Sequence, residues 1–311
     1  MSNVKVSVIM NCYNGEKFLR PAIDSVFAQT YQDWEIIFWD NASTDKSAEI
    51  AKSYGEKVKY YKNEKTSTLA AARNKAFEIA KGEFIAILDV DDLWMPTKLE
   101  KQVALMESDQ TLGFSYSDTM YFNEKGDIFN VFSSCSPKRG HIFGSLLESV
   151  QGYMSSEAIM FRRSILKEFS PIFNEKFHAA TDYDLLLRLA YKYKVDYVNE
   201  VLSKWRDHSG SSTSVARVEV PTENLILLED LLKANPDMKT KYDREIKTFD
   251  RKQHYLFAHA FWKAGNRRDA LEHLRPYLTE PKFLISFILI NFISYNFFAK
   301  CRNRMRTALA G

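Results

Sequence analysis

The chain has 311 residues, of which 45% are hydrophobic and 14% aromatic, so it can bury a large core and is not a disordered segment. Its formal net charge of +3 is small and argues neither for nor against a nucleic-acid partner. The three cysteines, Cys12, Cys135 and Cys301, are odd in number and far apart, which fits a reducing compartment and gives no support to a structural zinc site.

The N-terminal residues are typical of a first strand and not of a signal peptide. Residues 1–14 contain one lysine and a short apolar run that turns polar at Asn11. We therefore expect a cytoplasmic location.

The first hundred residues alternate short apolar strands with amphipathic helices. Because ligands bind at the carboxyl ends of parallel strands, we expect Asn11, Asp40 and the acidic residues 89–92 to line one site. This alternation predicts an α/β fold with a mostly parallel sheet flanked by helices. The predicted strands are 4–10, 34–39, 58–61 and 84–88, and the predicted helices are 18–30, 47–54 and 68–80.

The rest of the chain changes from mixed to helical character. Beyond about residue 221 the pattern is helical, so we predict one α/β domain over residues 1–220 and a helical extension over residues 221–311. Before that boundary the predicted strands are 113–122, 128–132 and 158–161, with helices at 98–107 and 181–193; after it the helices are 223–234, 239–264 and 267–278.

Asp89, Asp91 and Asp92 place three carboxylates at the end of an otherwise apolar strand. Like charges this close repel one another unless a cation lies among them. Mg²⁺ and Mn²⁺ prefer oxygen ligands and usually share them with substrate phosphates. The cluster therefore favours a metal–nucleotide site, and the alternative is a solvated acidic turn that caps the next helix.

Four segments occur in a fixed order along this part of the chain: SVIMNCYNG at 7–15, WDNASTD at 39–45, AARN at 71–74 and LDVDD at 88–92. Together they resemble the nucleotide-binding half of the family 2 glycosyltransferases, whose members typically have SVIIPxYN, VDDGSTD, ARN and DxDD. Asn11-Cys12 replaces the commoner Pro-Thr or Thr-Ser. Asn41-Ala42 replaces Asp-Gly, and Asn41 keeps a turn-forming side chain.

The resemblance implies a GT-A fold and an inverting glycosyltransferase that uses a nucleotide diphosphate sugar, expected to be UDP-linked, with Mn²⁺ or Mg²⁺. It implies that Asp89 and Asp91 are the DxD pair, with Asp92 adjoining. The direct metal ligand is then Asp91 or Asp92, and the choice between them stays open. The residues that the resemblance places around the nucleotide are Asn11, Tyr13, Asp40 and Arg73.

A second set of motifs lies about ninety residues further on. TDYDLLLR at 181–188 resembles the family's EDYDLWLR, so Asp182 matches the base that takes the proton of the acceptor hydroxyl. The usual glutamate before it is Thr181 here, which leaves the support of that carboxylate open. Asp184 is the rival base, and its alternative role is a first-turn charge that favours the helix dipole.

The stretch KWRDHSGSST at 204–213 resembles a family loop that closes over the donor diphosphate. In that role Arg206 and His208 would stabilise the leaving phosphates as cationic donors. The alternative is a flexible surface loop.

Residues 283–299 are strongly apolar and aromatic, and a basic run follows to residue 306. We expect one apolar helix that makes peripheral membrane contact through residues 283–306, with packing on the protein, a homodimer or a short membrane span as alternatives. Membrane contact would suit a glycan acceptor carried on a polyprenyl lipid. By resemblance this points to surface polysaccharide biosynthesis at the inner face of the cell membrane.

Two other functions remain open from the sequence. A nucleotidyltransferase also joins an α/β sheet to a metal–aspartate pair, but it would need a glycine-rich phosphate loop, and residues 11–15 contain one glycine. A non-catalytic nucleotide-sugar-binding protein of the same fold is the other. No nucleic-acid partner is expected, because no basic-aromatic stripe crosses the region.

Overall fold

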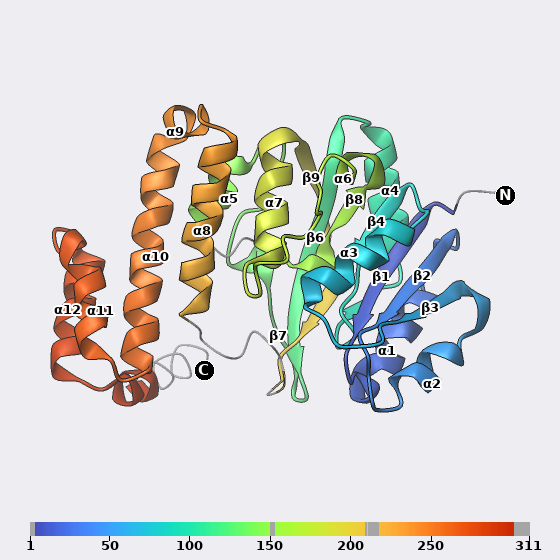
Figure 1. The fold of residues 1–311 in the computed structure, drawn as a ribbon, viewed down its shortest axis with the longest axis horizontal. Helices are drawn as coiled ribbons and strands as arrows, with labels where there is room; N and C mark the ends of the chain where they lie inside the picture. The colour runs from blue at the N-terminus through green and yellow to red at the C-terminus, as the bar shows by residue number, and fades with distance from the viewer. Residues whose placement is uncertain (1–3, 150–152, 209, 211–217, 302–311) are drawn as a thin grey trace. The chain divides into compact units, whose positions relative to one another are not determined.

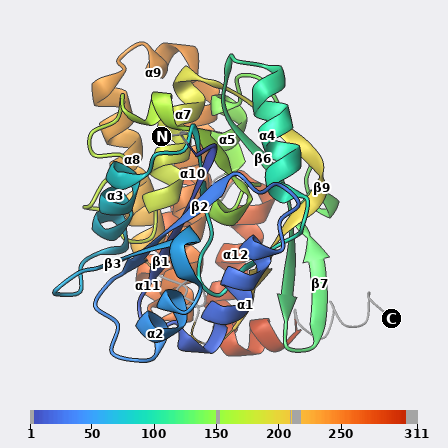
Figure 2. The same cartoon turned by 90° about the vertical axis from the view of Figure 1, so that its right-hand side faces the viewer.

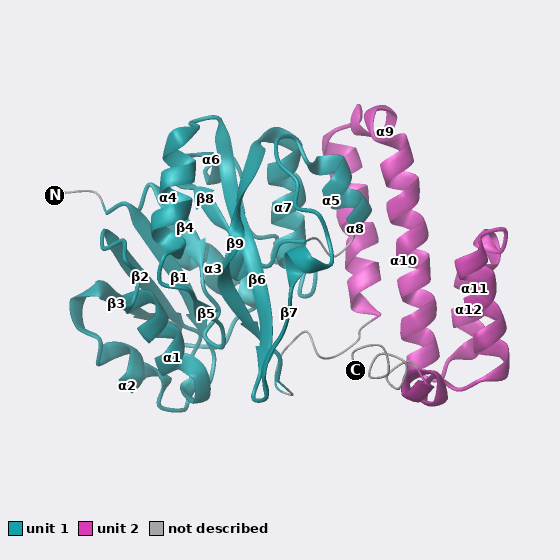
Figure 3. Cartoon of the chain, turned by 180° about the vertical axis from the view of Figure 1, so that it is seen from behind, with its two compact units in different colours: residues 1–211 teal, residues 212–311 magenta. Residues whose placement is uncertain are grey.

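The computed structural model describes residues 4–149, 153–208, 210 and 218–301. The chain divides into two compact units, residues 1–211 and residues 212–311 (Figure 3).

The first unit is built on a mixed sheet, which has nine strands over the described residues (Figure 1). The strand order is β3-β2-β1-β4-β8-β6-β9-β5, and β7 pairs with β6. Strands β1 to β4 run parallel to one another, whereas β8 is antiparallel to both β4 and β6. The strands are β1 (Val6–Cys12), β2 (Trp34–Asp40), β3 (Val58–Lys62), β4 (Phe84–Ile87), β5 (Leu93–Trp94), β6 (Leu112–Asn123), β7 (Gly126–Asn130), β8 (Met160–Arg162) and β9 (Lys194–Arg206).

Helices cover both faces of this sheet (Figures 1 and 2). The face seen in Figure 3 carries α1 (Glu16–Phe27), α2 (Ser47–Lys52) and α4 (Lys98–Ser108). The opposite face, seen in Figure 1, carries α3 (Leu69–Ile79) and α7 (Thr181–Lys192). The short helices α5 (Phe143–Ser149) and α6 (Arg163–Leu166) complete the unit.

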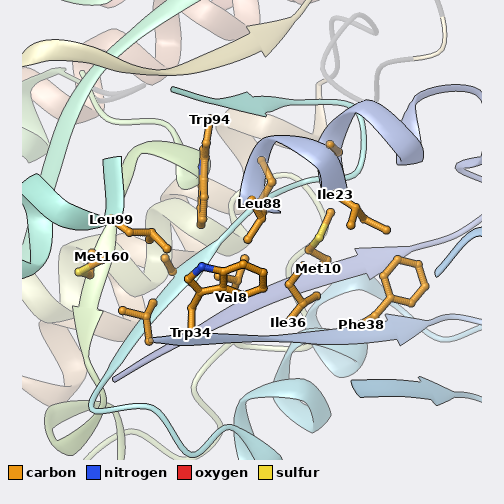
Figure 4. Close-up of a cluster of buried hydrophobic side chains, with 14 of the residues drawn as sticks. Val8, Met10, Ile23, Trp34, Ile36, Phe38, Leu88, Trp94, Leu99 and Met160 are labelled. Carbon is orange, nitrogen blue, oxygen red and sulfur yellow. The ribbon is translucent and has the colours of Figure 1, made fainter. Parts of the chain in front are cut away.

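The packed core fixes which side chains each strand sends to each face. Val8 and Met10 of β1 pack toward Ile23 of α1 in one buried cluster (Figure 4). Successive side chains of a strand point to opposite faces. Asn11, one position after Met10, therefore faces α3, and Asp89 faces the same side because its neighbour Leu88 lies in the α1 cluster.

The structure confirms the predicted α/β sheet, and most predicted elements agree within a few residues. Strand β9, thirteen residues long, was not predicted, and neither were α5 and β5. The predicted loop at 204–213 is wrong at its start, because Arg206 is the last residue of β9. The sequence KVDYVNEVLSKWR hides this strand, since charged residues interrupt its apolar pattern.

The second unit is helical over its described residues, with its own core around Trp262, Leu274 and Ile290. The predicted helix 239–264 is divided into α9 (Met238–Lys241) and α10 (Asp243–Lys263). The other helices are α8 (Glu219–Ala234), α11 (Arg267–Leu274) and α12 (Pro281–Phe292).

The prediction of a single helix over 283–299 is wrong. Helix α12 ends at Phe292, and a second helix, Tyr295–Cys301, follows after a bend of 119°. Among the helices that the structure describes, none is by itself both long enough and apolar enough to cross a membrane, although this bent pair meets the criterion together by length and composition.

One lysine lies in the core of the first unit. Lys98 of α4 is fully buried and donates a hydrogen bond to Gln102, one turn along the helix. Burial lowers the pKa of Lys98 from 10.5 to about 7, and the nearby carboxylate of Glu157 opposes this shift only in part. The folded protein therefore holds Lys98 neutral in a pH range where the unfolded chain carries it charged.

We expect this burial to make stability depend on pH. Between about pH 7 and 10.5 the unfolded state binds the Lys98 proton and the folded state does not, so the free energy of unfolding rises with pH. The contribution is at most about 1.4 kcal/mol per pH unit, and Lys98→Met should remove it. Urea unfolding at several pH values measures how steeply the free energy of unfolding changes with pH. The matched control is Lys101→Met, which changes a more exposed lysine of the same helix. Equal slopes for the parent and Lys98→Met would contradict the assignment.

Candidate functional site

Arg73 of α3 connects two acids that lie far apart in sequence. Its Nη2 donates to Asp89 Oδ1 at 3.0 Å, and its Nη1 is paired with Asp182 Oδ1. The guanidinium is buried, while both carboxylates keep about a third of their side-chain surface exposed. Burial alone would lower the pKa of Arg73, but the two carboxylates outweigh it and raise that pKa. The strand end at Asp89 and the start of α7 thus meet at one buried cation.

Asp182 is held by groups that the family-like motif does not contain. Its second oxygen, Oδ2, accepts a hydrogen bond from Ser156 Oγ at 3.1 Å. Thr181, which replaces the usual glutamate, is buried and donates instead to the carbonyl of Phe177. Arg73 and Ser156 therefore supply the support that the motif leaves open, and they hold the carboxylate in the first turn of α7.

Asp184, the rival base, has a structural role. It is buried, and its Oδ2 accepts hydrogen bonds from Nε and Nη2 of Arg188 at 2.9 and 2.6 Å. Arg188 also donates to the carbonyl of Ile172. This ion pair joins two residues one turn apart on α7 and stabilises the helix. Asp182 is then the more exposed of the two acids in the motif.

The acidic loop after β4 divides its carboxylates between the surface and the interior. Asp91 is partly exposed, and its Oδ2 lies 2.9 Å from Nε2 of His208. Asp92 is buried, and its Oδ1 accepts the backbone N–H of Arg206 at 2.8 Å. The two residues left open as metal ligands thus have different positions: Asp91 is the more exposed and contacts His208, whereas Asp92 is buried.

Negative charge is concentrated beneath this loop. Burial raises the pKa of Asp92, and the neighbouring carboxylates of Glu157, Asp89 and Asp91 raise it further. Glu157 is also buried, and burial raises its pKa to about 7. A divalent cation at the loop would relieve this repulsion, so the charge pattern fits a metal ion.

Arg206 fastens the end of β9 to the acidic loop. Its Nε donates to the carbonyl of Asp91 at 2.7 Å, and its guanidinium lies over the rings of Phe18 and Phe122. The ring of His208 also packs against Phe18, with centroids 4.9 Å apart. The predicted pair Arg206 and His208 therefore lies beside Asp91.

The loops after β1 and β2 are joined to each other. The backbone N–H of Asn14 donates to Ser43 Oγ, and Asp45 Oδ2 accepts the N–H of Glu16 at the start of α1. Tyr13, in the first loop, is 56% exposed and free to contact a ligand face. Ala42 has a φ of +64°, which explains why a glycine is usual at this position of the motif.

The structure moves Asp40 out of the predicted nucleotide pocket. Asp40 is fully buried, and its two oxygens accept hydrogen bonds from the N–H of Ser43 at 2.7 Å and from the hydroxyl of Tyr60 at 2.6 Å. Its side chain faces the α1 side, as the neighbouring Phe38 two residues earlier does. Asp40 shapes the loop, and this correction follows from strand alternation.

Among the buried polar groups that have no hydrogen-bond partner in the described part of the chain, three lie near the carboxyl ends of the strands. They are the side-chain amide of Asn11, the indole N–H of Trp39 and the Nε of Arg73. Asn11 and Trp39 are register partners on β1 and β2. Because unpaired buried polar groups are costly, these atoms are suited to the polar groups of a bound ligand.

A resident metal would use few protein ligands. Over the described residues, no three His, Cys, Asp or Glu side chains form a ready metal cage. Mg²⁺ is commonly bound by one or two carboxylates together with substrate phosphates. Asp91 fits that pattern as the carboxylate, His208 lies beside it, and the acids below them supply negative potential.

Sequence reasoning missed several supporting residues. Ser156, Phe18 and Glu157 contact or neighbour the predicted residues but belong to none of the quoted motifs. The one available signal was Glu157, an acid placed next to the apolar run AIMF at 158–161. Nothing in the sequence pairs it with Asp92.

Comparison with known proteins gives a family and several relatives. The model of glycosyl transferase family 2 matches residues 7–169. An uncharacterized glycosyltransferase of Methanocaldococcus jannaschii is 35% identical over 66% of this chain and 72% of its own length. The WfaP protein of Escherichia coli, a UDP-Glc:α-D-GlcNAc-diphosphoundecaprenol β-1,3-glucosyltransferase, is 31% identical over 74% of this chain and 88% of its own.

Solved structures share the fold. Residues 1–349 of TarS from S. aureus, in complex with UDP-GlcNAc, superpose with a TM-score of 0.65 at 19% identity, covering 92% of this chain and 90% of that one. The mannosyltransferase PcManGT of Pyrobaculum calidifontis, in complex with GDP-Man and Mn²⁺, has a TM-score of 0.60 at 16% identity, covering 92% and 84%.

We expect Arg73→Met to destabilise the protein by about 3–5 kcal/mol at neutral pH, because it leaves two carboxylates without their shared cation. Denaturant unfolding of parent and variant measures the difference. Asp89→Asn, which removes one carboxylate and keeps Arg73 paired with Asp182, is the control and should cost less. A loss no larger than that of the control would contradict the bridging role.

Proposed function

Because the chain belongs to glycosyl transferase family 2, a family of glycosyltransferases, and has the GT-A fold, we propose that it transfers a sugar with inversion from a UDP-linked donor to a hydroxyl group of a lipid-linked glycan. The observation that carries the proposal is the bridge of Arg73 between Asp89 and Asp182. It brings the acid of α7 to the strand end where the donor phosphates would bind. Surface polysaccharide biosynthesis is the setting that such an acceptor suggests.

Asp182 is proposed as the general base. Inverting transfer needs a carboxylate that takes the proton of the acceptor hydroxyl while its oxygen attacks the anomeric carbon from the side opposite the leaving group. The hydrogen bonds from Arg73 and Ser156 orient this carboxylate, and more than a third of its side chain stays exposed to an acceptor. The bond from the anomeric carbon to the diphosphate breaks as the new glycosidic bond forms.

The leaving diphosphate would be held by the loop after β4 and the end of β9. We assign Asp91 as the protein ligand of Mn²⁺ or Mg²⁺, with His208 beside it, in place of Asp92, which is buried and accepts a backbone N–H. Such an ion, when bound, neutralises the developing charge of the diphosphate. Arg206, stacked between two phenylalanine rings, places a further cation beside it.

The nucleoside would lie at the carboxyl ends of β1 and β2. The exposed ring of Tyr13 offers a face for stacking on a base, and the unpaired amide of Asn11 offers both a donor and an acceptor. The topological switch point of the sheet is next to this position, between β1 and β4, because the chain adds β2 and β3 on one side of β1 and β4 on the other.

The acceptor class is proposed from the relatives. WfaP and WfgD of Escherichia coli, 31% and 29% identical to this chain, are both named as glucosyltransferases that act on α-D-GlcNAc-diphosphoundecaprenol. A saccharide on a polyprenyl diphosphate is therefore the acceptor to test first, with UDP-Glc and UDP-GlcNAc as the first donors.

Asp182→Asn tests the assigned base. We expect transfer to fall by about 10²–10⁴-fold, because the amide cannot take the acceptor proton, while binding of UDP survives. Transfer to a polyprenyl-diphosphate GlcNAc acceptor measures the first quantity, and calorimetric titration with UDP measures the second. Ser156→Ala, which removes one orienting hydrogen bond, should reduce transfer by a smaller factor. Loss of UDP binding together with transfer would contradict the role.

Asp91→Asn tests the metal ligand. Binding of UDP in the presence of Mn²⁺ should weaken by at least about tenfold, because the carboxylate ligand is neutralised. Protection of the protein by UDP against heat, measured with Mn²⁺ and with EDTA, reports the metal-dependent part. Asp207→Asn, the carboxylate next to His208, is the matched control and should behave like the parent. Equal metal-dependent protection in Asp91→Asn and the parent would exclude Asp91.

A further inference from the structure

Helix α12 has apolar side chains on all sides, although only one of its sides is needed for packing. Phe283, Ser286 and Ile290 are buried in the core of the second unit, with the three- and four-residue spacing of one helix face. The residues between them are mostly apolar too. A helix of this kind normally covers its second apolar face with another surface.

That second face is exposed. Ile285 is 56% exposed, Ile288 47%, Leu284 44% and Phe292 80%. Leu284, Ile288 and Phe292 are four residues apart and lie along one side of the helix. Phe297, in the helix that follows the bend, is 57% exposed and adds an aromatic ring. Such a continuous apolar surface marks an interaction site.

The charges around this face favour one kind of partner. From Lys282 to the last residue the chain has five basic residues and no acidic one. Within the described part, Lys282 and Lys300 are exposed at the two ends of the apolar segment. The other three, Arg302, Arg304 and Arg306, follow in the sequence. A second copy of this segment would bring like charges together, whereas an anionic lipid surface would attract them.

We propose that the exposed face of α12, formed by Leu284, Ile285, Ile288 and Phe292, docks on the surface of an anionic phospholipid bilayer, with the helix lying along the interface. Aromatic and aliphatic side chains enter the boundary between headgroups and acyl chains, and Lys282 and Lys300 contact the headgroups. The face opposite is held by the protein core, as an interfacial helix requires. If the proposed function is right, docking brings the enzyme to acceptors carried on polyprenyl lipids.

The test uses the full chain and vesicles without any acceptor, so that its result does not depend on the proposed reaction. The parent should sediment with phosphatidylglycerol-rich vesicles, and much less with pure phosphatidylcholine or at high salt. The double variant Ile288→Asp/Phe292→Asp should bind the anionic vesicles more than about tenfold more weakly. Ile128→Asp, which changes an equally exposed residue of β7, is the matched control and should bind like the parent.

Folding and catalysis are measured separately. The double variant should keep the melting temperature of the parent and its hydrolysis of a UDP-sugar in the absence of vesicles, because both positions lie on the surface of the second unit. Unchanged vesicle binding by the double variant would overturn the proposal. The proposal would also be overturned if the parent were a dimer that does not bind vesicles and the double variant were a monomer. That result would assign the face to a second copy of the chain. Resistance of the parent to alkaline extraction from vesicles would indicate insertion across the bilayer and would also overturn it.

Discussion

The site depends on one buried cation. Arg73 lies in the interior of the first unit, where an unpaired guanidinium would be very costly, so its two carboxylates must be in place when the protein is folded. One of them follows β4 and the other begins α7, more than ninety residues later. The requirement to neutralise Arg73 therefore fixes the distance between the strand end and the helix that carries the proposed base.

Much of this arrangement could be predicted from the sequence, because it depends on local patterns. The apolar strands and the turns after them placed Asn11 and Asp89 at one edge of a parallel sheet, as the structure confirms. Asp182 could be placed only through the resemblance. Its partners Arg73 and Ser156 come from distant parts of the chain, and no local pattern records such contacts. Strand β9 was missed for the same reason, since its pairing with β6 compensates for a weak apolar pattern.

Strand alternation decides which of the predicted side chains reach the site. Asp40 and Asn11 both stand near strand ends, yet they face opposite sides of the sheet. Asp40 consequently serves the α1 side, where Tyr60 and the N–H of Ser43 satisfy its carboxylate. The sequence of a motif does not by itself show which face of the sheet each side chain occupies. The face of each strand residue had to be known before the motif could be assigned to ligand binding or to loop structure.

The position of Asn11 shows how stability and binding are balanced here. The commoner residue at this place in the motif is proline or threonine, and proline has no side-chain polar group to satisfy. Asn11 adds a buried donor and a buried acceptor that no described residue pairs with, at a cost of about 1–3 kcal/mol for unsatisfied groups. Trp39, its register partner on β2, carries a third unpaired group beside it. A ligand that supplies both an acceptor and a donor at this edge would recover that cost on binding, so these unpaired groups would contribute to the affinity of the proposed site.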